Sequence, residues 1–345
     1  MNFVRFVVAG LGWWGRSWTE VLQKHPGVQL LGTIDPSAEA REWSGENLGV
    51  RHFSDLEGAF SEMDADAVLV TTPPRLHVPV LVNALEHGKH VLVEKPLAVS
   101  PGEIGEMLAA VNRSEAKVMV AQGYRFMDSA TVLRKALEDG AIGKLQTIRI
   151  LFRQYIPDIL KRDHPLYQLK HSILLDMANH HFDLVCFLSG QDFSKASAFE
   201  YETPENVFAS PSSAFCLFTL ANDVHVTWDG DWCRNHPRTS WEGDWEFIGS
   251  EARMLWRGKQ DLQYKNRYLP EVMIERPDGS LEKISFKESV LDRRVPVLDH
   301  FVESILRGTQ PEPSVWDNVR VLSAVFGCIE SISTRSEVLL NGYEN

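Results

Sequence analysis

The chain has 345 residues, of which 44% are hydrophobic and 24% charged, and its formal net charge is −12. This length can supply two domains with separate cores, and the composition is that of an ordinary globular protein. The acidic balance, with no basic cluster, argues against nucleic acid or an anionic membrane surface as a partner.

The N-terminus and the cysteines bear on location. The start of the chain runs directly into the first predicted strand, and no apolar run approaches the length of a membrane span. The four cysteines are far apart and form no C-x-x-C pair. We therefore expect a cytoplasmic protein with no membrane partner, whose thiols are free and partly buried.

The first segment of the chain predicts a strand, a glycine-rich turn, a helix and a second strand. Gly10, Gly12 and Gly15 follow the first apolar run in the G-x-G-x-x-G spacing, and the second run ends at Asp35. This order is the fingerprint of a dinucleotide-binding unit, in which the helix N-terminus receives the pyrophosphate. The residues that we predict to bind the cofactor here are Gly10, Leu11, Gly12, Trp13, Trp14, Gly15 and Asp35.

The nature of the cofactor depends on two of these residues. Gly12 lacks a Cβ, so a pyrophosphate can lie against its backbone. The carboxylate of Asp35 can accept hydrogen bonds from a ribose diol and would repel a 2′-phosphate. We therefore predict NAD as the cofactor. NADP stays an alternative, because neighbouring side chains can offset the carboxylate.

Strands and helices then alternate up to about residue 121, which indicates a doubly wound parallel sheet with helices on both faces. Ligands of such sheets bind beyond the carboxyl ends of the strands. We therefore expect the polar turn at Thr72 and Pro73 to line the cofactor pocket. Further cofactor contacts are predicted at His77, Glu94 and Lys95.

The pattern changes near residue 123. A helix is predicted at 129–139. Strands then follow one another, interrupted by one helix at 172–188, and two helices, 296–307 and 315–334, end the chain. We predict a dinucleotide-binding Rossmann domain over 1–123 and an α+β domain over 124–345, with a large, mostly antiparallel open sheet. Because no Pro/Ser-rich linker separates them, we expect close packing, with the chemistry in the cleft between the domains.

Lys95 is the first candidate for chemistry. It follows a strand at its carboxyl end, where a lysine near the nicotinamide could hydrogen-bond a substrate hydroxyl and stabilise alkoxide character. The alternative is an ordinary solvated loop lysine.

The second candidate is the D-x-x-x-H-x-x-D pattern of Asp176, His180 and Asp183. On a regular helix Asp176 and His180 share a face, so the acid can orient the imidazole and adjust its pKa. One alternative is a pair of core histidines, His180 and His181. A metal site is disfavoured because these two histidines are adjacent and point about 100° apart around a helix.

Taken together, several motifs carry a resemblance: AGLGWWG at 9–15, HGKHVLVEKPLA at 87–98, GYRF at 123–126 and the acid–histidine pattern at 176–183. Over nearly its whole length the chain resembles the Gfo/Idh/MocA family, which includes glucose–fructose oxidoreductase and inositol dehydrogenase. The resemblance implies that Lys95 contacts substrate and cofactor, that His180 is the general acid/base and that Asp176 binds or orients. It also implies that the peptide bond before Pro96 is often cis.

The chain departs from the family near the expected substrate site. Lys170 to Ile173 stand where glycines are frequent, and Ala178 replaces another glycine. If His164, Lys170 and His171 face the pocket, they favour a polar, acidic substrate; the alternative is a solvated loop. The residues that we predict to bind substrate are Lys95, Arg125, His164, Lys170, Asp176 and His180.

Five of the ten tryptophans lie between Trp228 and Trp256. We predict that they serve an interface or the core, with stacking on a sugar as the alternative. The resemblance implies that the sheet of the second domain packs against another subunit, in a homodimer or homotetramer.

These observations favour an NAD(P)-dependent oxidoreductase that transfers hydride between nicotinamide and a carbinol or carbonyl carbon. The resemblance implies a small polyol, sugar or inositol-like substrate. Two alternatives remain open: a redox-neutral glycosidase that retains NAD, and a non-catalytic NAD(H) sensor. We predict no metal.

Overall fold

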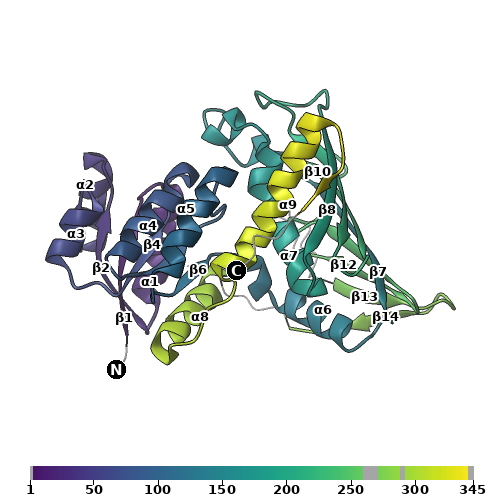
Figure 1. Cartoon of the computed structure of the whole chain (residues 1–345), viewed down its shortest axis with the longest axis horizontal. Helices are drawn as coiled ribbons and strands as arrows, with labels where there is room; N and C mark the ends of the chain where they lie inside the picture. The colour runs from purple at the N-terminus through teal and green to yellow at the C-terminus, as the bar shows by residue number, and fades with distance from the viewer. Residues whose placement is uncertain (1–2, 259–270, 288–291, 341–345) are drawn as a thin grey trace. The chain divides into compact units, whose positions relative to one another are not determined.

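The computed structural model describes residues 3–258, 271–287 and 292–340. It divides into two compact units (Figure 1). The first unit consists of Met1–Gly123 and Leu291–Val319, and the second of Tyr124–Val290 and Arg320–Asn345.

The sheet of the first unit is parallel throughout and has the strand order β3-β2-β1-β4-β5-β6. Its strands are β1 (Val4–Ala9), β2 (Val28–Ile34), β3 (Arg51–Phe53), β4 (Ala67–Val70), β5 (His90–Val93) and β6 (Val118–Val120). All of β4 is buried, as expected for a parallel strand covered on both faces. This is the order of a dinucleotide-binding fold, and it confirms the predicted class of the first domain.

Three helices of this unit begin at clear sequence signals. The side chain of Ser37 accepts the Ala40 N–H, the Asp55 carboxylate accepts the Gly58 N–H, and Ser100 forms a capping box with Glu103. The helices, drawn in purple and blue in Figure 1, are α1 (Trp13–Lys24), α2 (Ala38–Leu48), α3 (Leu56–Glu62), α4 (His77–Glu86) and α5 (Pro101–Asn112).

One segment lies in a different unit from the one that its sequence position suggests. Residues 291–319 belong to the first unit, although the predicted boundary assigns them to 124–345. The segment includes α8 (Arg294–Arg307), whose buried Phe301 meets Phe6 of β1 edge-on at 6.1 Å. The apolar face of α8 therefore completes the core of the first unit, and sequence order could not reveal this.

The second unit is built on a nine-stranded sheet, mostly antiparallel, as predicted. Only the β10–β7 pair is parallel among its described strand pairs. In sheet order from one edge the strands are β14 (Leu281–Ile284), β13 (Glu271–Glu275), β12 (Arg253–Arg257), β11 (Asp244–Gly249), β7 (Leu145–Arg153), β10 (His225–Asp231), β9 (Ser213–Leu220), β8 (Phe193–Tyr201) and β15 (Val338–Leu339).

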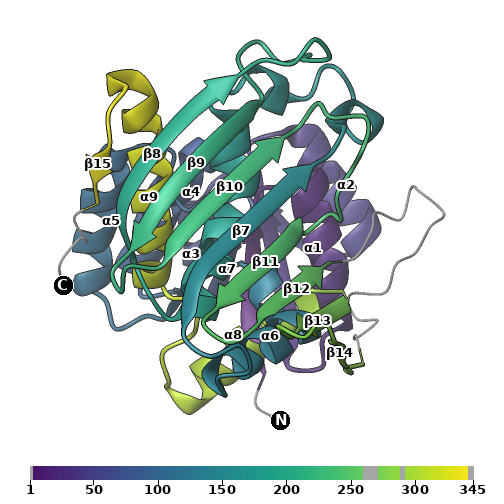
Figure 2. The ribbon, with the colours of Figure 1, turned by 90° about the vertical axis from the view of Figure 1, so that its right-hand side faces the viewer.

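Helices cover one face of this sheet, and Figure 2 looks onto the other face, which carries no helix from the described part of the chain. The covering helices are α6 (Asp128–Glu138), α7 (Asn179–Ser189) and α9 (Val315–Thr334). Four of the five clustered tryptophans are at most 2% exposed: Trp228, Trp232, Trp245 and Trp256. The core interpretation of this cluster is therefore confirmed for these four. In the described residues, no helix is long and apolar enough to cross a membrane.

His181 of α7 lies inside this aromatic core and is completely buried. The indole N–H of Trp228 donates to its Nδ1 at 2.9 Å, and the rings of Phe152 and Trp245 approach within 5.3 and 5.7 Å. Because Nδ1 accepts a hydrogen bond, the imidazole is neutral, with its proton on Nε2. Burial lowers the pKa of His181 to about 3.

Acidification is expected to destabilise the second unit through His181. Its folded pKa of about 3 lies below the ordinary value of 6.5, so between these values only the unfolded chain takes up the proton. The contribution of neutral His181 to the free energy of unfolding is therefore fully present above about pH 6.5. It is lost as the pH falls, by about 2 kcal/mol at pH 5. Urea unfolding at pH 8 and pH 5 should show this difference between the wild type and His181→Gln, which keeps an acceptor but does not titrate. An equal pH dependence in both proteins would contradict the account.

Candidate active site

Each glycine of the N-terminal turn has a distinct structural reason. Gly10 has a φ of +97°, and a Cβ there would lie 2.7 Å from the Thr72 nitrogen. A Cβ on Gly15 would lie 2.0 Å from the Gly10 oxygen, so this glycine lets α1 pack on the turn. A Cβ on Gly12 would have no atom within 4 Å, which leaves its backbone open to a ligand.

The N-terminus of α1 has the properties of an anion site. Gly12 is its N-cap, no side chain caps it, and its first turn contains no acidic residue. Trp13 is 78% exposed and Trp14 38%. The first N–H groups of the helix and the positive end of its dipole are therefore suited to a pyrophosphate.

Asp35 is fixed at the end of β2 by backbone donors. Its Oδ2 accepts the Leu11 N–H at 2.7 Å, and its Oδ1 accepts the Ser37 N–H at 2.8 Å. Each carboxylate oxygen keeps acceptor capacity for a ribose hydroxyl. Arg41 donates to the Asp35 carbonyl at 2.8 Å, and Arg16 donates to the Leu11 carbonyl at 3.0 Å. These two cations, which the sequence pattern did not single out, are the kind of neighbour that the NADP alternative requires.

The carboxyl ends of three adjacent strands bring the predicted residues of the first unit to one edge. Strands β1, β4 and β5 are neighbours in the sheet and run parallel. Gly10, Thr72 and Lys95 follow these strands in turn. The hydroxyl oxygen of Thr72 is buried without a hydrogen-bond partner. This orphaned polar atom and the open backbone at Gly12 fit a bound dinucleotide.

His77 joins two of these strand ends. Its Nδ1 lies 2.8 Å from the Pro96 carbonyl oxygen and its Nε2 lies 2.8 Å from the Thr72 carbonyl oxygen. The ring is buried, and burial lowers the pKa of His77. The ring nitrogens thus face backbone carbonyls, and a contact of His77 with the cofactor stays a prediction. The Lys95–Pro96 peptide bond is cis, as the family resemblance implied.

The helix predicted for 172–188 is not a regular α-helix. A π-helical turn, Leu174–Ala178, contains Asp176 and leads into α7, which contains His180. A π turn has i→i+5 hydrogen bonds, so it holds more residues per turn than an α-helix. Residues four apart still lie near one face of such a turn, and the pairing of Asp176 with His180 stays a prediction. The imidazole of His180 stacks on the ring of Tyr124, with centroids 4.4 Å apart and planes 7° from parallel.

Asp183 is the partner of Arg125. The Arg125 Nε and Nη2 donate to the two carboxylate oxygens at 2.7 and 2.8 Å. The two side chains are 7% and 0% exposed. This bidentate ion pair accounts for Arg125 structurally, and its contact with substrate stays a prediction.

The three basic residues at 164–171 have different surroundings. His164 and Lys170 are exposed, and the His164 side chain accepts the Leu166 N–H at the start of a short helix. His171 has a φ of +52° and its Nδ1 lies 2.9 Å from a carboxylate oxygen of Glu200. These local partners favour the loop alternative for His164 and His171; a role in substrate binding is untested.

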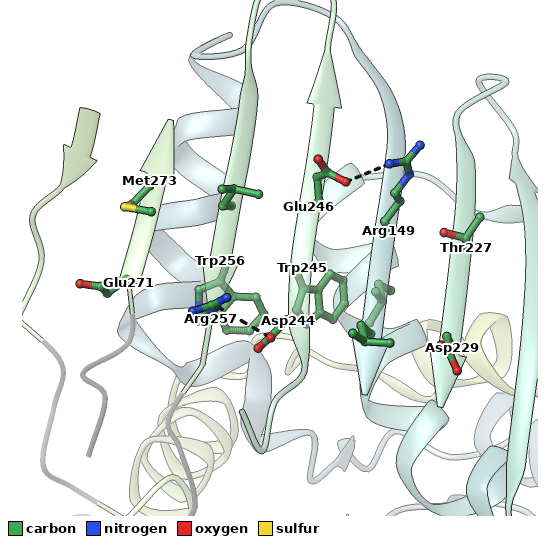
Figure 3. Close-up of a pocket in the computed structure, with 13 residues that line it drawn as sticks. Arg149, Thr227, Asp229, Asp244, Trp245, Glu246, Trp256, Arg257, Glu271 and Met273 are labelled. Atoms are coloured by element: carbon green, nitrogen blue, oxygen red, sulfur yellow. Dashed lines mark hydrogen bonds and ion pairs between the residues drawn. The ribbon is translucent and has the colours of Figure 1, made fainter. Parts of the chain in front are cut away.

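A depression of about 540 Å³ lies in the open face of the second unit's sheet (Figure 3). Charged side chains of adjacent strands point into it, with Arg149 bonded to Glu246 and Arg257 close to Asp244. None of the predicted catalytic or cofactor residues lines it. In the described residues, no three His, Cys, Asp or Glu side chains group as a metal site.

The fold and the glycine turn together define a nucleotide-binding protein of the doubly wound class. Residues 4–122 match the family model described as oxidoreductase family, NAD-binding Rossmann fold, and residues 131–255 match the Gfo/Idh/MocA C-terminal domain. The chain therefore belongs to the Gfo/Idh/MocA family of oxidoreductases, and residues 4–122 form its NAD-binding Rossmann domain.

Relatives of known activity are distant in sequence. A D-apiose dehydrogenase of Paraburkholderia graminis is 23% identical over 92% of this chain and 84% of its own length. An inositol 2-dehydrogenase of Rhizobium meliloti is 28% identical, over 55% of this chain and 56% of its own. An Agrobacterium radiobacter oxidoreductase, solved with NAD+, L-tartaric acid and magnesium, has a TM-score of 0.87 at 17% identity and covers 98% of this chain and 99% of its own. This last likeness concerns the fold.

Proposed function

We propose that the protein transfers hydride between NAD(P) and a carbinol or carbonyl carbon of a small polyol, sugar or inositol-like substrate. The observation that carries the proposal is the common edge of β1, β4 and β5, where the glycine turn, Thr72 and Lys95 follow adjacent parallel strands. Ligands of doubly wound sheets bind at this edge. The relatives that act on inositol and apiose support the substrate class.

In the proposed reaction the residues have separate roles. His180 takes the proton of the substrate hydroxyl, and Lys95 stabilises the oxyanion that develops. Asp176 positions the substrate. When bound, NAD supplies the hydride acceptor. Lys95 belongs to the first unit and the other two to the second, and the proposal assigns all three to one reaction.

Tyr124 supports the assignment of His180 as the acid/base. A face-to-face ring stack limits the rotation of the imidazole and offers its charged form the π face of an electron-rich ring. A residue that must take up and release a proton in a fixed direction benefits from both effects.

A panel of polyols, inositols, sugars and sugar acids with NAD or NADP tests the proposal through absorbance of the reduced nicotinamide. We expect net reduction with at least one substrate, and a loss of about a hundredfold or more in Lys95→Ala and His180→Ala. Lys144→Ala and His87→Ala are matched controls, since both residues are exposed and outside the predicted site. No reduction with any substrate, or full activity of the Lys95 and His180 variants, would refute the proposal.

We also infer that a second copy of this chain covers the open face of the nine-stranded sheet. Phe199 and Leu217 are 58% and 52% exposed there, and the rings of Phe199 and Tyr201 each lie 5.3 Å from that of Phe215. Exposed aromatic clusters of this kind are typical of interfaces. Sedimentation should show a dimer or tetramer that Phe199→Asp dissociates, and a monomeric wild type would refute it.

A cytoplasmic location is consistent with the cysteines. The four cysteines of the chain are free, and three of them, Cys216, Cys233 and Cys328, are buried. Reduced thiols are usual in the cytoplasm. Cell fractionation tests this location, and recovery outside the cytoplasmic fraction would refute it.

A further inference from the structure

Glu94 has an unusual environment for a carboxylate. It is the last residue before Lys95 and is only 7% exposed. Its Oε1 accepts the indole N–H groups of Trp14 and Trp18, at 2.5 and 2.7 Å, and its Oε2 accepts the Lys95 backbone N–H at 3.2 Å. Burial raises the pKa of Glu94. The first unit thus keeps a costly buried acid directly beside the proposed catalytic lysine.

The two indoles come from one face of α1. Trp14 and Trp18 are four residues apart on this helix, so both N–H groups reach the same oxygen. The guanidinium of Arg294 lies over both rings, with its carbon 4.9 and 5.6 Å from their centroids. Arg294 also donates to Ser17 at 2.6 Å. Through Arg294, helix α8 therefore packs on the ring faces of the two indoles whose N–H groups bond Glu94.

Three N–H donors converge on this one side chain, and this explains why a carboxylate is needed. Glutamate accepts hydrogen bonds at both oxygens, whereas glutamine of the same shape would turn an NH2 group toward one of the donors. If the Glu94 oxygen on the indoles were kept, the NH2 group would face the Lys95 N–H. A purely space-filling role would not require the acid.

We propose that Glu94 is a positioning residue for Lys95: it holds the backbone of Lys95 where the chain leaves β5, and Trp14 and Trp18 fix Glu94. This inference rests on the proposed function, in which Lys95 acts on the substrate. Trp14 also lies in the first turn of α1, whose N–H groups are suited to a pyrophosphate. One helix therefore serves both the cofactor and the lysine. This role differs from the cofactor contact that the sequence predicted for Glu94.

The decisive variant is Glu94→Gln, with Glu106→Gln of α5 as the control because Glu106 is exposed. We expect kcat to fall about ten- to a hundredfold in Glu94→Gln, as for the loss of a buried hydrogen bond to a charged group. The Kd for NAD should stay within about twofold of the wild type. A normal kcat, or a weakened NAD affinity with kcat preserved, would overturn the inference.

A double variant separates positioning from independent action. If Glu94 acts through Lys95, Glu94→Gln should slow the Lys95→Ala enzyme no further. Effects that multiply would overturn the inference. Trp14→Phe removes one of the donors to Glu94 and should give a smaller loss of kcat. This variant replaces Glu94→Gln in the test if Glu94→Gln does not fold.

Nuclear magnetic resonance tests the geometry without turnover. With 15N-tryptophan, two indole N–H signals should lie downfield, as expected for donation to a carboxylate; Trp14→Phe and Trp18→Phe identify them. Both should move upfield in Glu94→Gln, and the Lys95 amide should exchange faster. If no substrate is turned over, the proposed function fails, and these signals still decide the contact: unchanged signals would overturn it.

Discussion

Gly15→Ala is expected to abolish most of the affinity for NAD. A Cβ at this position would lie 2.0 Å from the Gly10 oxygen and 2.7 Å from the Thr71 hydroxyl oxygen. Backbone cannot yield as a flexible side chain does, so α1 has to move away from the turn and carries its N–H groups with it. An overpacking cost of about 3 kcal/mol corresponds to about a hundredfold in Kd.

Calorimetry with NAD measures this effect, and two other glycines supply the comparison. Gly105 is an exposed residue of α5, and a Cβ there would have no atom within 4 Å, so Gly105→Ala should bind NAD normally. Gly12→Ala also meets no protein atom, so it should fold with wild-type stability but bind NAD more weakly. Wild-type affinity in Gly15→Ala, or in Gly12→Ala, would show that the pyrophosphate does not lie on this turn.

Arg125→Met is expected to lower the free energy of unfolding of the second unit by about 3–5 kcal/mol. The reason is Asp183, whose side chain is 0% exposed and accepts hydrogen bonds from two nitrogens of the guanidinium. Methionine fills much of the arginine volume but leaves the carboxylate buried without its counter-charge. The expected loss is therefore electrostatic and exceeds what the lost packing alone would cause.

Urea unfolding followed by tryptophan fluorescence measures this loss, since Trp228, Trp232, Trp241, Trp245 and Trp256 report on the second unit. Arg125→Met/Asp183→Leu is the control, because removing both charges also removes the uncompensated acid. We expect it to recover much of the stability. A single variant as stable as the wild type would mean that this pair contributes nothing to the fold.

The local parts of the nucleotide site could be predicted from sequence because their reasons are local. The glycine spacing, the apolar strand and Asp35 all lie within a short segment, and each reflects a steric or charge requirement of a βαβ unit. The structure supplies what spacing cannot. It shows that Asp35 is held by the Leu11 N–H and that Arg41 lies beside it.

The candidate site residues of the second unit were harder to predict from sequence than those of the first. The sequence predicted a regular α-helix around Asp176 and His180 and gave no sign of the π turn that contains Asp176. Asp183 has the spacing of a catalytic acid, yet its partner, Arg125, is 58 residues earlier in the chain.

The sequence did not predict the short strands β3 and β15, since runs of three and two residues carry little periodic signal.

The same limit applies to Glu94. In sequence it is part of Glu-Lys-Pro, and the expectation was a cofactor contact. The structure surrounds it with Trp14 and Trp18, about eighty residues earlier. The sequence could not show that Glu94 accepts hydrogen bonds from two indoles, because these tryptophans meet it only in the folded chain.

The most direct test of the proposed reaction is the fate of the carbinol hydrogen. A substrate from the panel, deuterated at the reacting carbon, is incubated with the protein and NAD, and the nicotinamide is recovered for mass spectrometry. The account predicts one deuterium per reduced nicotinamide, with labelled nicotinamide forming about a hundredfold more slowly in Lys95→Ala or His180→Ala. A product that keeps its deuterium while the nicotinamide stays unlabelled and oxidised would contradict a dehydrogenase and favour the redox-neutral alternative.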